Sequence, residues 1–182
     1  ARSPGDGSRL PLEQAAPAAR VHAGATHGLY GFLDFLARQL MPDTAETEYL
    51  ERHANVYGLT RTPAEYANGN VTLPGLNGAV VPAGRAMLRA DGAVFFTTAD
   101  ATVASGAATV AVIADEPGAA GNANAGVAMT LVEPVEGVES AGTVAAGGLA
   151  GGADAETDAA LRARLLGRIQ APPNGGSASD YV

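Results

Sequence analysis

The sequence predicts an α+β protein in which helical segments flank a central antiparallel β domain. Three observations support this class. Apolar residues recur every three or four positions in the first third of the chain and again near its end, which is the spacing of amphipathic helices. Between residues 70 and 134 the period changes to two, and glycine-containing turns separate short apolar runs. Such frequent turns favour an antiparallel β-sandwich or a small barrel over a parallel sheet.

The composition limits the classes of function. The 182 residues carry a net charge of −8, and all 11 cationic side chains are arginine. Nucleic-acid-binding proteins usually present a basic face, and none is evident, so we expect no nucleic acid partner. The absence of cysteine excludes disulfides, thiol catalysis and zinc-thiolate sites within this sequence. No apolar run approaches the roughly 20 residues that span a bilayer, and the first residues lack the apolar core of a signal peptide, so we expect no membrane partner.

The first third of the chain is predicted to be helical. Residues 1–11 are polar and rich in glycine and proline, which predicts a flexible N-terminus, and residues 12–68 form the predicted helical region. Its first helix extends to about Met41. Three glycines weaken this helix by about 1 kcal/mol each relative to alanine. They either allow another helix to approach closely or mark a break near residues 22–27; they are Gly24, Gly28 and Gly31.

A second helix is predicted from Pro42, with Asp43 or Thr44 as its start, to about Tyr57. Gly58 follows at the position of a C-terminal cap. Because the connection to the first helix is short, the two helices are predicted to form an αα-hairpin. The apolar side of the second helix carries Ala45, Tyr49, Leu50, His53, Val56 and Tyr57.

Residues 69–136 are predicted to form the antiparallel β domain. Asp91-Gly92 lies between apolar runs and is a strong signal for a two-residue hairpin, and Ser105-Gly106 is a weaker one. Residues 118–126, with the sequence GAAGNANAG, are predicted to form a tight loop. Residues 137–152 are rich in glycine and alanine, which predicts a connector.

Residues 153–182 are predicted to contain an amphipathic helix over about 155–170, followed by a truncated C-terminal segment. Acidic residues at or near the helix start suit the positive end of the helix dipole, and a Pro-Pro pair ends the helix. The chain stops soon afterwards, and we expect it to be a fragment of a longer protein. The acidic residues are Asp154, Glu156 and Asp158, the apolar stripe is Leu161, Leu165, Leu166 and Ile169, the arginines around it are Arg162, Arg164 and Arg168, and the terminating pair is Pro172-Pro173.

Several of these segments, in order along most of the chain, resemble the baseplate J family of contractile-tailed bacteriophages. They include GGADAETDAALRAR with the following PPNGGSASDY, GLYGFLDFLARQLMPDTAETEYLERHANVYGLTR, EPGAAGNANAG and VEGVESAGTV. The resemblance implies a structural protein of the baseplate wedge, which assembles in the host cytoplasm and resides in the virion tail. It also implies partners: other copies of the chain and neighbouring wedge and hub proteins, in a ring whose rearrangement triggers sheath contraction.

No catalytic, cofactor or metal site is predicted, and no small-molecule substrate is expected. His22 and His27 are five residues apart, so they do not share a helical face with each other, and nothing indicates that they converge with His53. An oxygen-rich loop could bind calcium, but its spacing does not match the EF-hand pattern. The candidate ligands of that loop are Asp115, Glu116, Asn122 and Asn124.

The alternative to a baseplate protein is a secreted or surface β-rich adhesion or carbohydrate-binding module. The helical first third and the lack of clustered aromatic residues argue against it. The helices of residues 12–57 and 155–170 are predicted to carry much of the self-association, because their apolar faces are too large for a small β core to cover. The candidate interface residues are Leu29, Phe32, Leu33, Leu36, Tyr49, Leu50, Tyr57, Arg162, Leu165, Leu166 and Ile169.

Overall fold

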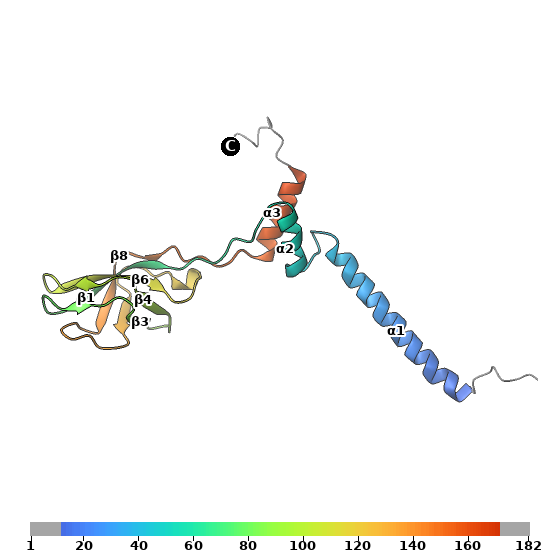
Figure 1. The fold of residues 1–182 in the computed structure, drawn as a ribbon, viewed down its shortest axis with the longest axis horizontal. Coiled ribbons are helices and arrows are strands. Elements are labelled where there is room, and N and C mark those ends of the chain that lie inside the picture. Colours follow the sequence, from blue (N-terminus) through green and yellow to red (C-terminus); the bar gives the residue numbers. More distant parts are fainter. Residues whose placement is uncertain (1–11, 172–182) are drawn as a thin grey trace, which may run out of the picture. The chain divides into compact units, whose positions relative to one another are not determined.

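The computed structural model describes residues 12–171, with side chains described from residue 17 onward (Figure 1). The chain divides into two compact units. The helical unit comprises residues 1–60 and 158–182, and the barrel unit comprises residues 61–157. The predicted flexible N-terminus of residues 1–11, the terminating Pro172-Pro173 pair and the segment that follows it lie outside the described residues.

The order of elements confirms the α+β class. The helical unit contains α1 (Leu12–Gln39), α2 (Thr47–Val56) and α3 (Asp158–Gln170). The barrel unit contains β1 (Asn68–Pro74), β2 (Val80–Val81), β3 (Ala86–Arg89), β4 (Val94–Thr97), β5 (Ala101–Thr102), β6 (Ala107–Ala114), the 3₁₀ turn η1 (Ala119–Gly121), β7 (Ala128–Leu131) and β8 (Ala141–Ala150).

Six of the strands close into an antiparallel barrel, which decides between the predicted sandwich and barrel. Their order is β1-β6-β4-β3-β7-β8, and β8 pairs again with β1. Strands β2 and β5 form a separate two-stranded sheet. Side chains of β6 are alternately buried and more exposed, as the period of two predicts. The buried interior includes Val71, Leu73, Met87, Phe95, Val110, Val112, Met129, Leu131 and Val144.

Both predicted hairpins are present, with a difference in loop length. Ser105-Gly106 is the two-residue loop: both residues have positive φ, and Ala104 and Ala107 exchange two backbone hydrogen bonds. Around Asp91-Gly92 the loop has three residues, because the Arg89 amide bonds to the Ala93 carbonyl and Gly92 takes a φ of +93°. A single positive-φ glycine after a tight turn is typical of this longer hairpin.

The Gly/Ala-rich connector predicted for residues 137–152 is wrong, because most of that stretch is strand β8. Small residues are required where β8 lies against β1. A Cβ built at Gly69 would lie 2.4 Å from the carbonyl oxygen of Gly148, and one at Gly142 would lie 2.7 Å from that of Thr72. A register shift between Gly69 and Val71 marks the irregularity in this pairing. The glycines and alanines of this stretch therefore reflect the close approach of the β1 and β8 backbones, and they do not mark a loop.

The helical unit has its own small core between α2 and α3, which replaces the predicted αα-hairpin of the first two helices. Leu50 and Ala54 of α2 are buried together with Leu161 and Leu165 of α3. Ala45, which precedes α2, completes the buried cluster, and none of the α1 side chains that the structure describes, from residue 17 onward, belongs to it.

The starts of α2 and α3 also differ from the prediction. Each helix begins about three residues later than expected, and the Thr47 hydroxyl donates to the Asp158 carboxylate at 2.5 Å where the two begin. Before α2, the chain makes a turn in which the Ala45 amide bonds to the Met41 carbonyl. Before α3, Asp154 instead accepts a hydrogen bond from the amide of Ala119.

Helix α1 is continuous, so the predicted break near residues 22–27 is wrong. Its last residue, Gln39, joins it to α2: the side-chain oxygen accepts from the Glu46 amide at 2.8 Å, and its carbonyl lies 2.8 Å from His53 Nε2. Phe35 makes an edge contact with Tyr49, with ring centroids 6.1 Å apart. Nothing in the described chain comes within 4 Å of a Cβ built at any of the three helix glycines, so the predicted close approach of another helix there is not made within this chain.

Candidate functional site

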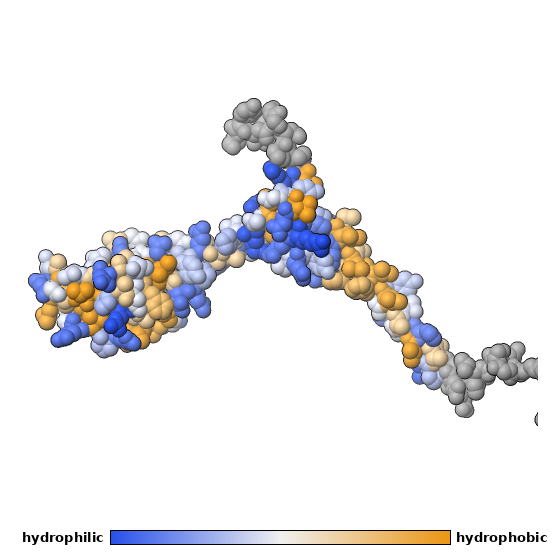
Figure 2. Space-filling view, in the orientation of Figure 1, coloured by the Kyte–Doolittle hydropathy of each residue, from blue (hydrophilic) through white to orange (hydrophobic). Residues whose placement is uncertain are grey.

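Helix α1 presents an apolar face that the described chain does not cover. Leu29, Phe32 and Leu33 are 64%, 56% and 57% exposed. Leu36 continues the same face on the next turn, and Leu40, which directly follows the end of α1, is also exposed. Figure 2 shows apolar residues along this helix. Because exposed apolar surface of this extent is rare on a soluble protein without a partner, α1 is the leading candidate for an interaction site.

The opposite face of α1 is polar. Arg38 donates to the Asp34 carboxylate at 2.6 Å, and both side chains are more than 60% exposed. Such an exposed pair contributes little to stability. Helix α1 is therefore an amphipathic rod, about 40 Å long at 1.5 Å per residue. Among the residues that the structure describes, no helix combines the length and apolar character needed to cross a membrane.

Other predicted interface residues lie inside the helical core. Leu50 and Leu165 have no exposed surface, and both belong to the α2–α3 cluster. Tyr49 and Ile169 are partly buried against the same cluster. The spacing of apolar residues predicts a buried face at these positions but does not identify what covers it, and the covering element is the neighbouring helix of the same chain. Leu50 and Leu165 are therefore corrected from interface to core.

Arg162 also acts within the chain. Its guanidinium donates to the Ala45 carbonyl at 2.7 Å and to the Pro42 carbonyl at 3.3 Å. These bonds hold the turn before α2 against α3, a structural role that the sequence did not indicate. Of the remaining candidates, Tyr57 is 44% exposed and Leu166 is half-buried.

The barrel contains a buried arginine that sequence reasoning missed. Arg89, at the end of β3, is only 8% exposed. Its side chain lies over the Phe95 ring, 5.5 Å from the centroid. The sequence does contain a signal. Arg89 lies two positions after Met87 in the same strand, so the two side chains project to the same side, and Asp91 follows two residues later as an ion-pair partner.

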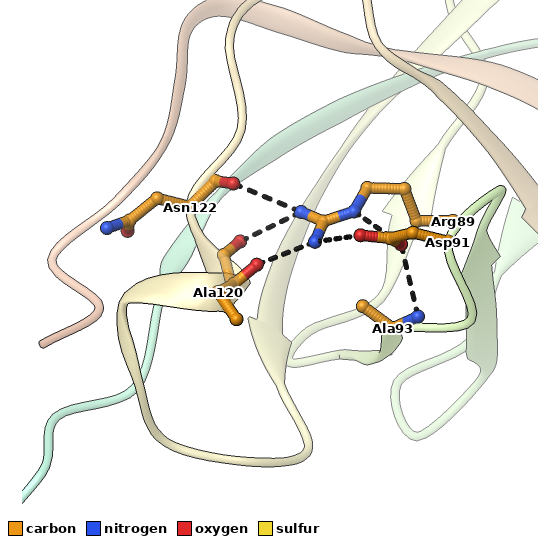
Figure 3. A network of polar contacts seen from close by, with 6 residues as sticks. Arg89, Asp91, Ala93, Ala120 and Asn122 are labelled. Atoms are coloured by element: carbon orange, nitrogen blue, oxygen red, sulfur yellow. Dashed lines mark hydrogen bonds and ion pairs between the residues drawn. The ribbon is translucent and has the colours of Figure 1, made fainter. Parts of the chain in front are cut away.

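Arg89 joins the β3–β4 hairpin to the loop that contains η1 (Figure 3). It donates twice to the Asp91 carboxylate, at 2.8 and 2.6 Å. The remaining donors reach three successive carbonyls, those of Ala120 at 2.6 Å, Gly121 at 3.2 Å and Asn122 at 3.1 Å. A planar guanidinium can satisfy five acceptors at once, which an ammonium group cannot.

The pairing changes the acidity of both side chains. The hydrogen bonds from Arg89 lower the pKa of Asp91 to about 2, and the Asp91 carboxylate raises the pKa of Arg89. The backbone amide of Ala93 also donates to Asp91, at 3.2 Å, and stabilises the same ionised form. The pair therefore stays ionised throughout the physiological pH range.

A pocket of about 360 Å³ opens beside this network. Its lining includes Asp115 and Glu116, two of the four candidate calcium ligands. A third, Asn122, uses its side-chain amide to exchange two hydrogen bonds with the backbone of Gly152. Among residues 12–171, no group of three or more acidic or histidine side chains is arranged to hold a metal ion. The hydrogen bonds of Arg89 and Asn122 therefore hold this loop against the rest of the barrel unit.

Comparison with known proteins identifies the barrel. Residues 70–152 match the family described as the baseplate J-like protein barrel domain. The chain is 37% identical over 164 residues to the "Mu-like prophage FluMu protein gp47" of Haemophilus influenzae, an alignment that covers 90% of this chain and 46% of the relative. It is 35% identical over 183 residues to the "Baseplate protein gp47" of Escherichia phage Mu, covering 100% of this chain and 50% of the relative.

The chain thus spans about half the length of the curated relatives it matches. The match includes β8, which the sequence pattern predicts as a connector, so the family barrel and the observed barrel coincide over nearly all of their length. The closed barrel, the family match and these relatives together show that the chain belongs to the baseplate J-like family of phage proteins.

Proposed function

We propose that this chain is a structural component of the tail baseplate of a contractile-tailed phage or a related injection system. The observation that carries the proposal is the baseplate J-like barrel, supported by a relative that is named as a baseplate protein. A shape-based role suits the geometry, because Arg89 and Asn122 use their polar groups to hold the barrel's own loops.

The finer proposal is that the chain works in the baseplate wedge, with other copies of itself and with neighbouring wedge and hub proteins as partners. It would assemble in the host cytoplasm and reside in the virion tail. A ring that rearranges to trigger sheath contraction needs interfaces that hold in one state and shift in another. A rigid barrel joined to a unit with an exposed helix provides both a fixed body and a surface for contacts.

Within this function, α1 is the assembly element. Its exposed apolar face would bury side chains that now contact water, and each fully buried leucine or phenylalanine contributes about 1.5–3 kcal/mol. The repeat of Leu29, Leu33, Leu36 and Leu40 at steps of three and four suits packing against another helix. Helix α1 also carries few charges, so charge repulsion does not oppose pairing between copies.

Incorporation into tail particles tests the function directly. In the full-length protein, the double variant Leu33→Glu/Leu36→Glu places charges on the apolar face and should reduce incorporation strongly, as measured by the amount of the protein that sediments with tails. The matched control, Asp34→Ala/Arg38→Ala, changes the polar face of the same helix and should incorporate normally. A wild-type protein that never sediments with tail structures would contradict the function itself.

Light scattering tests the assembly role of α1 separately. The wild-type chain should self-associate, and the Leu33→Glu/Leu36→Glu variant should be monomeric with an unchanged helical signal in circular dichroism. A wild-type chain that remains monomeric at high concentration would overturn self-association through α1 and leave the baseplate assignment standing.

A further inference from the structure

The outer surface of the barrel carries an apolar patch whose residues are not part of the buried core. The patch lies on three adjacent strands, β6, β4 and β3, and on the residue that directly follows β7. Its exposed members are Leu88 at 42%, Ile113 at 36% and Val132 at 57%. We call this surface the β3–β4 face; its residues are Ala86, Leu88, Val94, Phe96, Ile113 and Val132.

The strand register makes these residues neighbours. Phe96 is paired with Ile113 on one side and with Ala86 on the other. The row continues to Val132, whose amide donates to the Ala86 carbonyl at 3.0 Å. Directly opposed residues on antiparallel strands project to the same side, so this row forms one continuous surface. Leu88 and Val94 are paired in the same way and extend the patch by a second row.

The patch is separate from the barrel core. Along β3 and β4 its members alternate with the buried Met87 and Phe95, so they point away from the interior. A solvent-facing strand position is more commonly polar, and six apolar residues in two registered rows are unusual on an exposed barrel wall.

The charge around the face indicates what covers it. Residues 61–157 contain three arginines and ten acidic residues, a net charge of −7 out of −8 for the whole chain. All three arginines are engaged within the chain: Arg85 pairs with Glu133, Arg89 pairs with Asp91, and Arg61 donates to the Glu156 carbonyl. Acidic side chains border the patch: Glu133 follows Val132, and Asp115 lies beside Val94, to whose carbonyl its amide is bonded.

We propose that the β3–β4 face is the docking site for a protein of a different kind, which presents an apolar centre bordered by lysine or arginine. A second copy of the barrel does not suit this face, because two surfaces of the same strong negative charge repel each other. A basic partner gains both apolar burial and charge complementarity. The proposal rests on the proposed baseplate role and names the chemistry of one neighbour in it.

The absence of lysine from these 182 residues allows a selective test. A carbodiimide joins carboxylates to amines without a spacer, so cross-links from Glu133 or Asp115 to a lysine must reach another polypeptide or a part of the protein beyond this sequence. In isolated tail particles, peptide mapping should find these carboxylates linked to a lysine of one different protein, within a basic segment. Links that lead only to other copies of this protein, or no links from either carboxylate, would overturn the proposal.

Paired variants separate the apolar contribution from the charge. Val132→Arg places a positive charge against a basic partner and should lower the cross-link yield at Asp115 by at least roughly tenfold. Val132→Glu should reduce the yield less, and Leu76→Arg, at a 74% exposed position of the barrel unit outside the patch, should leave it unchanged. Equal yields from Val132→Arg and Leu76→Arg would contradict docking at this face.

Circular dichroism of each purified variant establishes that the barrel is folded. Sedimentation of each variant with tails distinguishes the two levels of the argument. A protein that joins tail particles while the β3–β4 face remains unlinked refutes only this inference, whereas a wild-type protein absent from particles refutes the proposed function.

Discussion

The barrel unit and the helical unit solve the problem of burying apolar residues in opposite ways. The barrel closes on itself and gathers fifteen buried hydrophobic residues into one core. Among its described residues, the helical unit buries only five hydrophobic residues, none of them in α1, and leaves the apolar face of α1 exposed. The barrel therefore buries most of its apolar residues in its own core and leaves the β3–β4 face exposed, whereas the helical unit leaves the apolar face of α1 for a partner.

The largest expected loss of stability is in the helical unit, at α3, where two neighbouring leucines have different surroundings. Leu165→Asp places a carboxylate in the fully buried α2–α3 cluster and should cost about 5 kcal/mol or more, enough to unfold the cluster. The matched Leu166→Asp change, at a half-buried position, should cost much less. Helical circular dichroism and thermal unfolding of both variants measure the difference, and equal losses would show that the two leucines share one environment.

The next largest effect is expected inside the barrel. Phe95 has no exposed surface, and Phe95→Ala removes a large part of the interior at a cost of about 3–5 kcal/mol. Denaturant unfolding followed by amide exchange should show the loss at β1, β4 and β6 while protection in α2 and α3 is unchanged. A simultaneous loss in the helices would show that the two units unfold as one.

A smaller effect is expected where the barrel holds its loop. Arg89→Lys keeps the positive charge but cannot bond to the Asp91 carboxylate and three carbonyls in one plane. Leaving buried carbonyls without donors should cost about 1–3 kcal/mol. Amide exchange should increase in residues 118–123, and unchanged exchange there would refute the role of the guanidinium in holding the loop.

The smallest effect concerns pH. The native pKa of Asp91 is about 2, below its unfolded value near 4, so its ionised form favours the folded state. This contribution is complete above the unfolded pKa and is lost as the pH falls from about 4 to about 2. Asp91→Asn should therefore flatten the pH dependence of stability in that interval, measured by denaturant titrations from pH 5 to pH 2. A variant with the wild-type pH profile would exclude Asp91 as its source.

Much of this architecture was predictable because local rules govern it. The period of two marked the strands, and the turn glycines marked the hairpins, since positive φ costs glycine little. The string of motifs placed the chain in its family. The sequence also predicted that Leu29, Phe32, Leu33 and Leu36 form an apolar face, and the structure leaves that face exposed; its role in self-association stays a prediction.

The errors arose where a residue's role depends on what lies opposite it. Strand β8 was missed because its glycines and alanines lack a strand-like apolar pattern, and only the approach of β1 explains them. The pairing of Arg89 with Asp91 has a local signal, but the backbone carbonyls that it also binds lie some thirty residues away in the chain. No local pattern carries information about either neighbour.

The sequence by itself determined the class, the turns, the apolar faces and the family, since each depends on residues close together in the chain. The tertiary structure decided which apolar face is core and which is surface: Leu165 is buried against α2, whereas no described element covers Leu33 of α1, which is 57% exposed. The physical reason is that hydrophobic burial belongs to two surfaces that meet, and a sequence pattern describes only one of them.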